Sequence, residues 1–201
     1  MIDIDKLPST LTELEKQLRF AAVIALTRTA IDGQKAVREQ QEKLFTLRNK
    51  WTQRGVRITP ATKQKVESEV YLADWYIAQF EEGGSRKKPK GESFQIPAFI
   101  REVAGISEKK LIPKSKKVSV LSTKKFKGKR TFIAQMKKGK RGLFVKTDDQ
   151  VNPIRLLYVL QDKDIPIKKK PFFFKAVDKA YLHNVEKHYD KAIIDAFKSM
   201  K

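Results

Sequence analysis

Apolar positions recur every three or four residues over two long stretches, one toward each end of the chain. The first runs from Leu11 to Leu44, with Gly33 weakening the helical tendency in its interior. The second runs from Phe174 to Phe197 and follows Pro171, a residue that suits the first turn of a helix. A period near 3.6 is typical of a helix with one buried face. We therefore predict a long helix at each end, the first either bent at Gly33 or divided there into two.

Between these stretches the apolar positions alternate with polar ones, which is typical of strands with one buried face. One short helix is predicted over residues 74–80. The predicted strands lie at residues 51–58, 66–72, 94–97 and 151–159, with a hairpin formed by residues 131–136 and 142–146. This order predicts an α+β fold, in which long N- and C-terminal helices pack on an antiparallel sheet. The length of 201 residues suits a single domain over residues 1–201.

Residues 98–130 interrupt this pattern. Apolar residues are sparse there, lysines occur in pairs, and no helical or strand period is sustained. The preceding residues 86–91 are charged and contain Pro and Gly. We therefore predict a basic loop or extended arm, inserted into the single domain at about residues 85–130.

Positive charge is concentrated in the middle of the chain. The formal net charge is +21, and residues 86–146 hold 20 Lys and Arg against three acidic residues. Two interpretations remain open: a surface that attracts a polyanion such as DNA, or a solvated loop whose lysines only maintain solubility. The candidate contacts with DNA or with an acidic partner are Lys116, Lys117, Lys124, Lys125, Lys127, Lys129, Arg130, Lys137, Lys138, Lys140 and Arg141.

The sequence contains no arrangement of residues that is typical of a catalytic site. The chain has no cysteine, and its two histidines, His183 and His188, are five residues apart and so face different sides of a helix. We predict no catalytic residue, no metal site and no cofactor, and hence a protein that is not an enzyme. The longest apolar run, residues 20–26, is too short to cross a bilayer, and the acidic N-terminus does not resemble a signal peptide. We expect no contact with membranes and a cytosolic site of synthesis.

Three consecutive aromatic residues, Phe172, Phe173 and Phe174, stand where the last helix is predicted to begin. Three neighbouring side chains at a helix start cannot all face one core, so at least one points elsewhere. An exposed phenylalanine would bury its surface against another subunit. We therefore predict a subunit interface here, with packing inside the chain as the alternative.

Several segments together resemble a known family. They are residues 20–30 (FAAVIALTRTA), residues 76–84 (YIAQFEEGG) followed by a basic loop, the strand at 94–97, the hairpin at 142–145, and residues 156–160 leading to the last helix. In this order they resemble the minor tail protein Z-like tail-completion proteins of long-tailed bacteriophages, over roughly residues 15–97 and 131–197. Residues 98–130 match no part of the family pattern.

The resemblance implies a structural virion protein, located in the tail or neck and assembled in the cytoplasm of the host bacterium. It implies a homo-oligomer, expected to be a hexameric ring around the DNA path, beside tail terminator, tail tube and neck or connector proteins. Contact with phage double-stranded DNA would be non-specific. The predicted interface residues are then Gln79, Gly83 and Gly84 together with Phe172–Phe174. The alternative is a cytosolic nucleic-acid-binding protein that uses the lysine-rich central segment.

Overall fold

The structure is a computed structural model that describes residues 7–88, 90, 92–136 and 139–199. It divides the chain into two compact units. The helical unit comprises residues 1–82 and 169–201, and the basic unit comprises residues 83–168. Helices and antiparallel strands occur together, so the predicted α+β class is confirmed. The predicted single domain with an insertion becomes two units, because the central segment and the strands after it form a core of their own.

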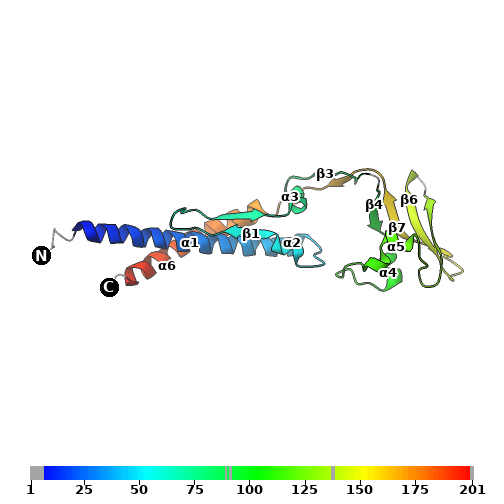
Figure 1. Ribbon diagram of the computed structural model, residues 1–201, viewed down its shortest axis with the longest axis horizontal. Coiled ribbons are helices and arrows are strands. Elements are labelled where there is room, and N and C mark those ends of the chain that lie inside the picture. The colour runs from blue at the N-terminus through cyan, green and yellow to red at the C-terminus, as the bar shows by residue number, and fades with distance from the viewer. Residues whose placement is uncertain (1–6, 89, 91, 137–138, 200–201) are drawn as a thin grey trace. The chain divides into compact units, whose positions relative to one another are not determined.

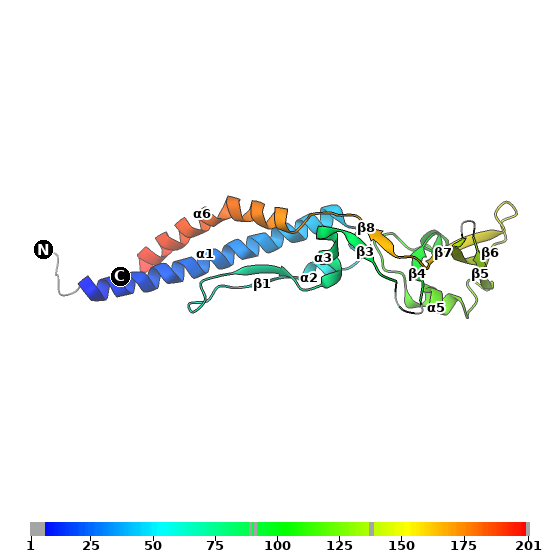
Figure 2. The same ribbon diagram turned by 90° about the horizontal axis from the view of Figure 1, so that it is seen from above.

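Two long helices form the frame of the helical unit. Helix α1 spans Leu7–Leu44 without interruption, and α6 spans Phe174–Ser199 and runs back along it (Figures 1 and 2). Small side chains line part of the contact, where Ala21 and Ala25 of α1 meet Ala192 and Ala196 of α6. Gly33 is buried within α1, and a Cβ built there would lie 3.4 Å from a methyl carbon of Val70. The close packing of Val70 against this position accounts for a glycine here, and α1 continues through Gly33 as a single helix.

A strand hairpin lies along α1 in the same unit (Figure 2). It consists of β1 (Val56–Thr59) and β2 (Glu69–Leu72), which pair antiparallel from Val56↔Leu72 to Thr59↔Glu69. The short helices α2 (Trp51–Arg54) and α3 (Trp75–Glu82) flank the hairpin. The predicted strand at residues 51–58 is thus strand only from Val56. Trp51 is 65% exposed, so its alternation with polar neighbours does not mark a buried face.

The basic unit contains a four-stranded antiparallel sheet in the order β4-β7-β6-β5. Its strands are β4 (Phe94–Pro97), β5 (Thr131–Gln135), β6 (Arg141–Lys146) and β7 (Ile154–Gln161), which confirms the predicted hairpin and its neighbours. The register shifts after Leu143, because Leu143 faces Tyr158 whereas Phe144 faces Leu156. A separate pair joins β3 (Gly84–Arg86) to β8 (Ile165–Ile167).

The predicted arm over residues 98–130 is corrected by the structure, because this segment folds onto the sheet. It forms α4 (Ile100–Ala104), the 3-10 helix η2 (Lys114–Lys116) and α5 (Val118–Leu121). Four of its apolar side chains, those of Ile100, Val118, Leu121 and Phe126, are buried with residues of β6 and β7, whereas Phe99 and Leu111 are exposed. The core of the unit comprises Ile100, Val118, Leu121, Phe126, Leu143, Val145, Leu157, Tyr158 and Leu160. Each helix is about one turn long, so no helical period accumulates in the sequence.

Candidate functional site

Positive charge is divided unevenly between the two units. The basic unit holds 23 Lys and Arg against seven Asp and Glu, whereas the helical unit holds 21 against 16. The charge predicted to lie on a flexible insertion therefore belongs to a folded unit. A folded unit with this charge presents its cations in a defined arrangement, which favours contact with a polyanion.

Three of the predicted cationic contacts have partners inside the basic unit. Lys129 pairs with Asp148, and Arg141 pairs with Asp162 at 3.1 Å. The ammonium of Lys116 lies 4.7 Å from the ring centroid of Phe126, in a cation–π contact. These three side chains stabilise the fold of the unit, so they contribute less to binding than their charges suggest.

The remaining described candidates are exposed and have no ion pair within the described residues. They are Lys117, Lys124, Lys125, Lys127, Arg130 and Lys140. Lys137 and Lys138, also predicted as contacts, lie outside the described residues. Four members of the exposed set lie in sequence between α5 and β5, whereas Lys117 directly precedes α5 and Lys140 directly precedes β6. We refer to Lys117, Lys124, Lys125, Lys127, Arg130 and Lys140 below as the free cations.

A tight turn holds the middle of this set. Phe126 and Lys129 exchange two backbone hydrogen bonds, of 2.8 and 3.0 Å, across Lys127 and Gly128. The φ angles of Lys127 (49°) and Gly128 (79°) are both positive, as a type I′ turn requires. Phe126 is only 2% exposed and anchors the turn in the core. Lys127 therefore stands at the tip of an ordered turn. The turn was not predicted from the sequence, although Gly128 suits a position with a positive φ angle.

Two acidic side chains of the basic unit, those of Asp149 and Asp162, accept hydrogen bonds and lie close to cations. The pKa of Asp162 is lowered by a hydrogen bond from Ser93 and by Arg141 beside it. The pKa of Asp149 is lowered by backbone N–H groups, chiefly that of Val151 at 2.9 Å. Both carboxylates are consequently ionised at neutral pH and compensate cations locally. The free cations, together with other exposed lysines of the basic unit such as Lys109, Lys110 and Lys146, carry the charge that remains for a partner.

The predicted aromatic interface divides between the core and the surface. Phe172 and Phe173 are 0% and 9% exposed and pack with Val37 and Ile77. Phe174 is 62% exposed. Phe172 and Phe173 therefore serve packing inside the chain, and only Phe174 is accessible to another subunit; its role there stays a prediction.

A buried carboxylate fixes this arrangement. Glu81 of α3 accepts hydrogen bonds from the backbone N–H groups of Phe172 (2.8 Å) and Phe173 (3.0 Å). A longer one comes from Phe174 (3.4 Å), the first residue of α6. These N–H groups precede or begin a helix and have no acceptor within it. Glu81 thus caps α6 from a distant element, a role that local sequence patterns did not reveal.

The other predicted interface residues lie near the boundary between the units. Gln79 is half-buried in α3, and its role in an interface stays a prediction. Gly83 follows α3 with a φ of 82°, the left-handed conformation in which helices commonly end. Gly84 has a φ of 136° and pairs with Ile167. Both glycines have backbone roles that account for them without a partner.

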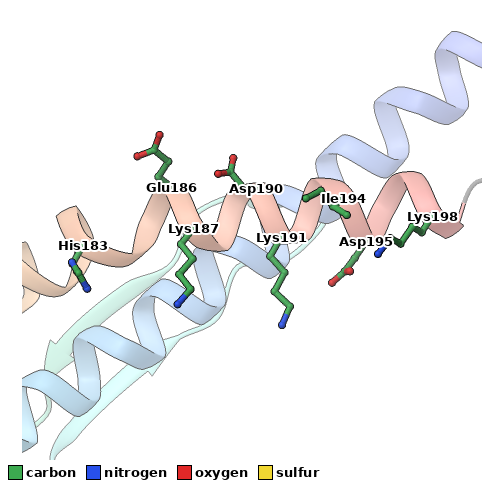
Figure 3. A pocket seen from close by; sticks show the side chains of 8 residues that line it. All are labelled: His183, Glu186, Lys187, Asp190, Lys191, Ile194, Asp195 and Lys198. Atoms are coloured by element: carbon green, nitrogen blue, oxygen red, sulfur yellow. The ribbon is translucent and has the colours of Figure 1, made fainter.

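The two histidines occupy different surfaces of α6. His188 lies toward α1, and its Nε2 is 2.7 Å from a carboxylate oxygen of Asp32. His183 is exposed at one end of a shallow hollow of about 590 Å³, lined only by residues of α6 (Figure 3). The lining alternates acids such as Asp190 with bases such as Lys191, as a solvated helix surface does. Among the described residues no group of His, Asp or Glu is placed to hold a metal ion.

No described helix is both long enough and apolar enough to span a membrane. The chain matches no protein-family model, and neither a curated protein nor a solved structure is detectably similar to it.

Proposed function

We propose that this protein is a structural subunit of the tail or neck of a long-tailed bacteriophage, and that its basic unit faces a polyanion. The polyanion would be the DNA that passes through the assembly or an acidic surface of a neighbouring protein. The separation of charge between two units, each with its own core, is the observation that carries the proposal. The phage setting is supported by the resemblance of the segments described above.

The basic unit suits non-specific contact with phosphates. Its free cations are almost all lysines, which interact with phosphates as point charges, whereas reading base edges relies mainly on bidentate arginine, asparagine and glutamine. Binding through lysines releases counterions and is tolerant of sequence. Contact of this kind suits a protein beside the DNA path, because the passing DNA has no fixed sequence there.

The helical unit suits contact between protein subunits. It carries little net charge, so copies of it repel one another weakly. Large apolar side chains are exposed along both long helices. They include Leu11 (57%) and Leu18 (41%) on α1, and Phe174 (62%), Tyr181 (49%), Leu182 (77%) and Phe197 (52%) on α6. Different patches on one subunit allow heterologous contacts, which form a ring where the rotation between neighbouring subunits closes; the expected ring is hexameric. Tail terminator, tail tube or neck proteins would be its neighbours.

The second candidate is a nucleic-acid-binding protein that acts as a monomer. It is favoured by the ordered turn that presents Lys127, because an ordered basic surface can bind duplex without any ring. Light scattering and negative-stain images separate the two candidates. Closed rings, or binding to purified tail tubes, support the structural subunit. A monomer that binds duplex DNA with a steep dependence on salt supports the alternative.

Matched charge variants test the role of the basic unit. Lys117, Lys124, Lys125 and Lys127 are changed together to Gln, and the control changes the exposed helical-unit residues Lys175, Lys179, Lys187 and Lys191 to Gln. Both variants remove the same charge. If the free cations neutralise phosphates, only the first variant lowers the salt dependence of duplex binding, by about 0.9 in log–log slope for each phosphate that is no longer neutralised. Equal effects of the two variants would contradict a specific role for the basic unit.

A further inference from the structure

Strand β5 forms an edge of the four-stranded sheet, and no described strand pairs with its outer side (Figure 2). Natural sheets protect such edges with charged residues, proline or bulges. Residues 131–135 read Thr-Phe-Ile-Ala-Gln and contain none of these. The opposite edge, β4, ends in Pro97, which has no N–H to offer. The two edges therefore differ, and β5 is the edge that has neither a charged residue nor a proline.

The hydrogen-bond pattern identifies the backbone groups that face outward. The N–H of Met136 donates to the carbonyl of Lys140 at 2.6 Å, and the pairing continues in the same register along β5 and β6. In an antiparallel ladder, hydrogen-bonded pairs alternate with pairs whose backbone groups point away. The alternation places the N–H and C=O groups of Thr131, Ile133 and Gln135 on the open side. These residues offer donors and acceptors at the spacing that an added strand needs.

Apolar side chains lie beside this edge on both faces of the sheet. Ile133 is 49% exposed and lies on the face that carries the core, opposite Leu143. On the other face the rings of Phe132 and Phe144 stack with centroids 5.8 Å apart. A strand added to β5 would cover side chains on both faces, and cross-strand pairs of this type stabilise sheets.

Charge selects the kind of strand that fits. Lys127 and Arg130, two free cations, precede β5, and Lys140 lies across the hairpin at the start of β6. The acid Asp148 forms an ion pair with Lys129, so it does not offset the charge of these free cations. A second copy of the basic unit would bring a large positive charge against this surface, so electrostatics disfavour it. An acidic segment would be attracted.

We propose that the outer edge of β5 binds an extended, acidic segment of another protein, which adds to the sheet as a fifth strand. Backbone hydrogen bonds supply the affinity, and the surrounding cations select an acidic partner. The site shares Lys127, Arg130 and Lys140 with the phosphate contacts of the proposed function, but the backbone hydrogen bonds of β5 belong to it alone. It requires neither a ring nor DNA.

The test uses the full chain and a fluorescent peptide in which Val and Glu alternate. The control peptide has the same sequence with alternate backbone amides methylated, so that its charge is retained but its strand hydrogen bonds are removed. We expect the control to bind at least about tenfold more weakly in fluorescence anisotropy. Equal binding of the two peptides would overturn the proposal and leave only charge attraction.

Two variants locate the site. Ile133→Pro removes the central outward N–H, whereas the control Ile133→Val keeps it, so only the first should weaken binding of the Val-Glu peptide, by at least about tenfold. Hydrogen exchange on the unmodified protein provides a measurement that does not depend on the variant folding. The bound peptide should protect the amides of Ile133 and Gln135, and absence of protection there would overturn the proposal.

Binding of duplex DNA by the Ile133→Pro variant separates this proposal from the proposed function. Loss of peptide binding with DNA binding retained supports a separate strand site. In the four-lysine variant, loss of DNA binding while the Val-Glu peptide still binds at least about tenfold more tightly than its methylated control also supports a separate strand site. Peptide binding that competes fully with DNA and is unaffected by Ile133→Pro would overturn the strand site.

Discussion

The buried carboxylate of Glu81 should contribute strongly to the stability of the helical unit. Its two shorter hydrogen bonds, from the N–H groups of Phe172 and Phe173, hold the start of α6 against the core. The positive end of the helix dipole adds to the attraction. Replacing Glu81 therefore removes the acceptor for several backbone donors at once.

The size of the effect follows from these hydrogen bonds. A hydrogen bond to a charged group contributes about 1.5–3 kcal/mol, and a buried donor left without an acceptor costs about 1–3 kcal/mol. Glu81→Gln keeps the shape and one acceptor oxygen, so we expect a decrease in stability of about 2 kcal/mol. Glu81→Ala leaves the N–H groups of Phe172 and Phe173 buried without an acceptor, and we expect a decrease of about 3–5 kcal/mol.

Guanidinium unfolding followed by far-ultraviolet circular dichroism measures this stability, because α1 and α6 dominate the helical signal. Glu82→Gln is the matched control: the residue is adjacent and exposed, and the substitution removes the same charge. It should change the free energy of unfolding by no more than about 0.5 kcal/mol. A Glu81→Gln variant as stable as the Glu82→Gln control would refute the capping role.

Two further variants test the buried side-chain amide of Gln41 and the ionised carboxylate of Asp162. Gln41 is fully buried in α1, one turn from Val37 and Phe45. Neither the nitrogen nor the oxygen of its side-chain amide has a hydrogen-bond partner among the described residues. Gln41→Met should therefore raise the free energy of unfolding by about 1–2 kcal/mol, seen as a higher guanidinium midpoint at unchanged slope; a lower midpoint would show that the amide is satisfied. Because the pKa of Asp162 is lowered in the folded protein, its ionised form stabilises the basic unit at every pH above the ordinary aspartate pKa of about 3.9. This stabilisation is lost as the pH falls through the lowered pKa. Asp162→Asn should reduce stability at neutral pH and flatten its decline as the pH falls below the ordinary aspartate pKa, and unfolding curves of equal pH dependence in the two proteins would contradict this.

Elements with a sustained period were predictable from the sequence. The two long helices, the short helix at residues 74–80 and the hairpin at residues 131–146 all appear near their predicted positions. In each, neighbouring turns or alternating residues share one buried face, so local spacing contains the information. The start of β1 was less accurate, because Trp51 is apolar but exposed.

For the candidate site, the sequence predicted which residue types are present and where they lie along the chain, but not which of them are paired. The sequence placed the lysines in the middle of the chain, but it could not separate Lys129, paired with Asp148, from the exposed Lys127 two residues earlier. The pairing of Arg141 with Asp162 joins residues far apart in the chain and likewise depends on the fold. Ion pairs of this kind reflect proximity in space, which a linear charge pattern does not contain.

By itself, the sequence determined the α+β class, the long helices and the location of the positive charge, since each depends on local spacing or on composition. The tertiary structure alone decided that residues 98–130 are folded. Val118 and Phe126 each stand between polar neighbours, and with Ile100 they become a core only by packing on β6 and β7. The structure also decided which phenylalanine of Phe172–Phe174 faces outward, because Glu81, distant in sequence, fixes where α6 begins. Burial depends on contacts between residues far apart in the chain, and those contacts exist only once the chain is folded.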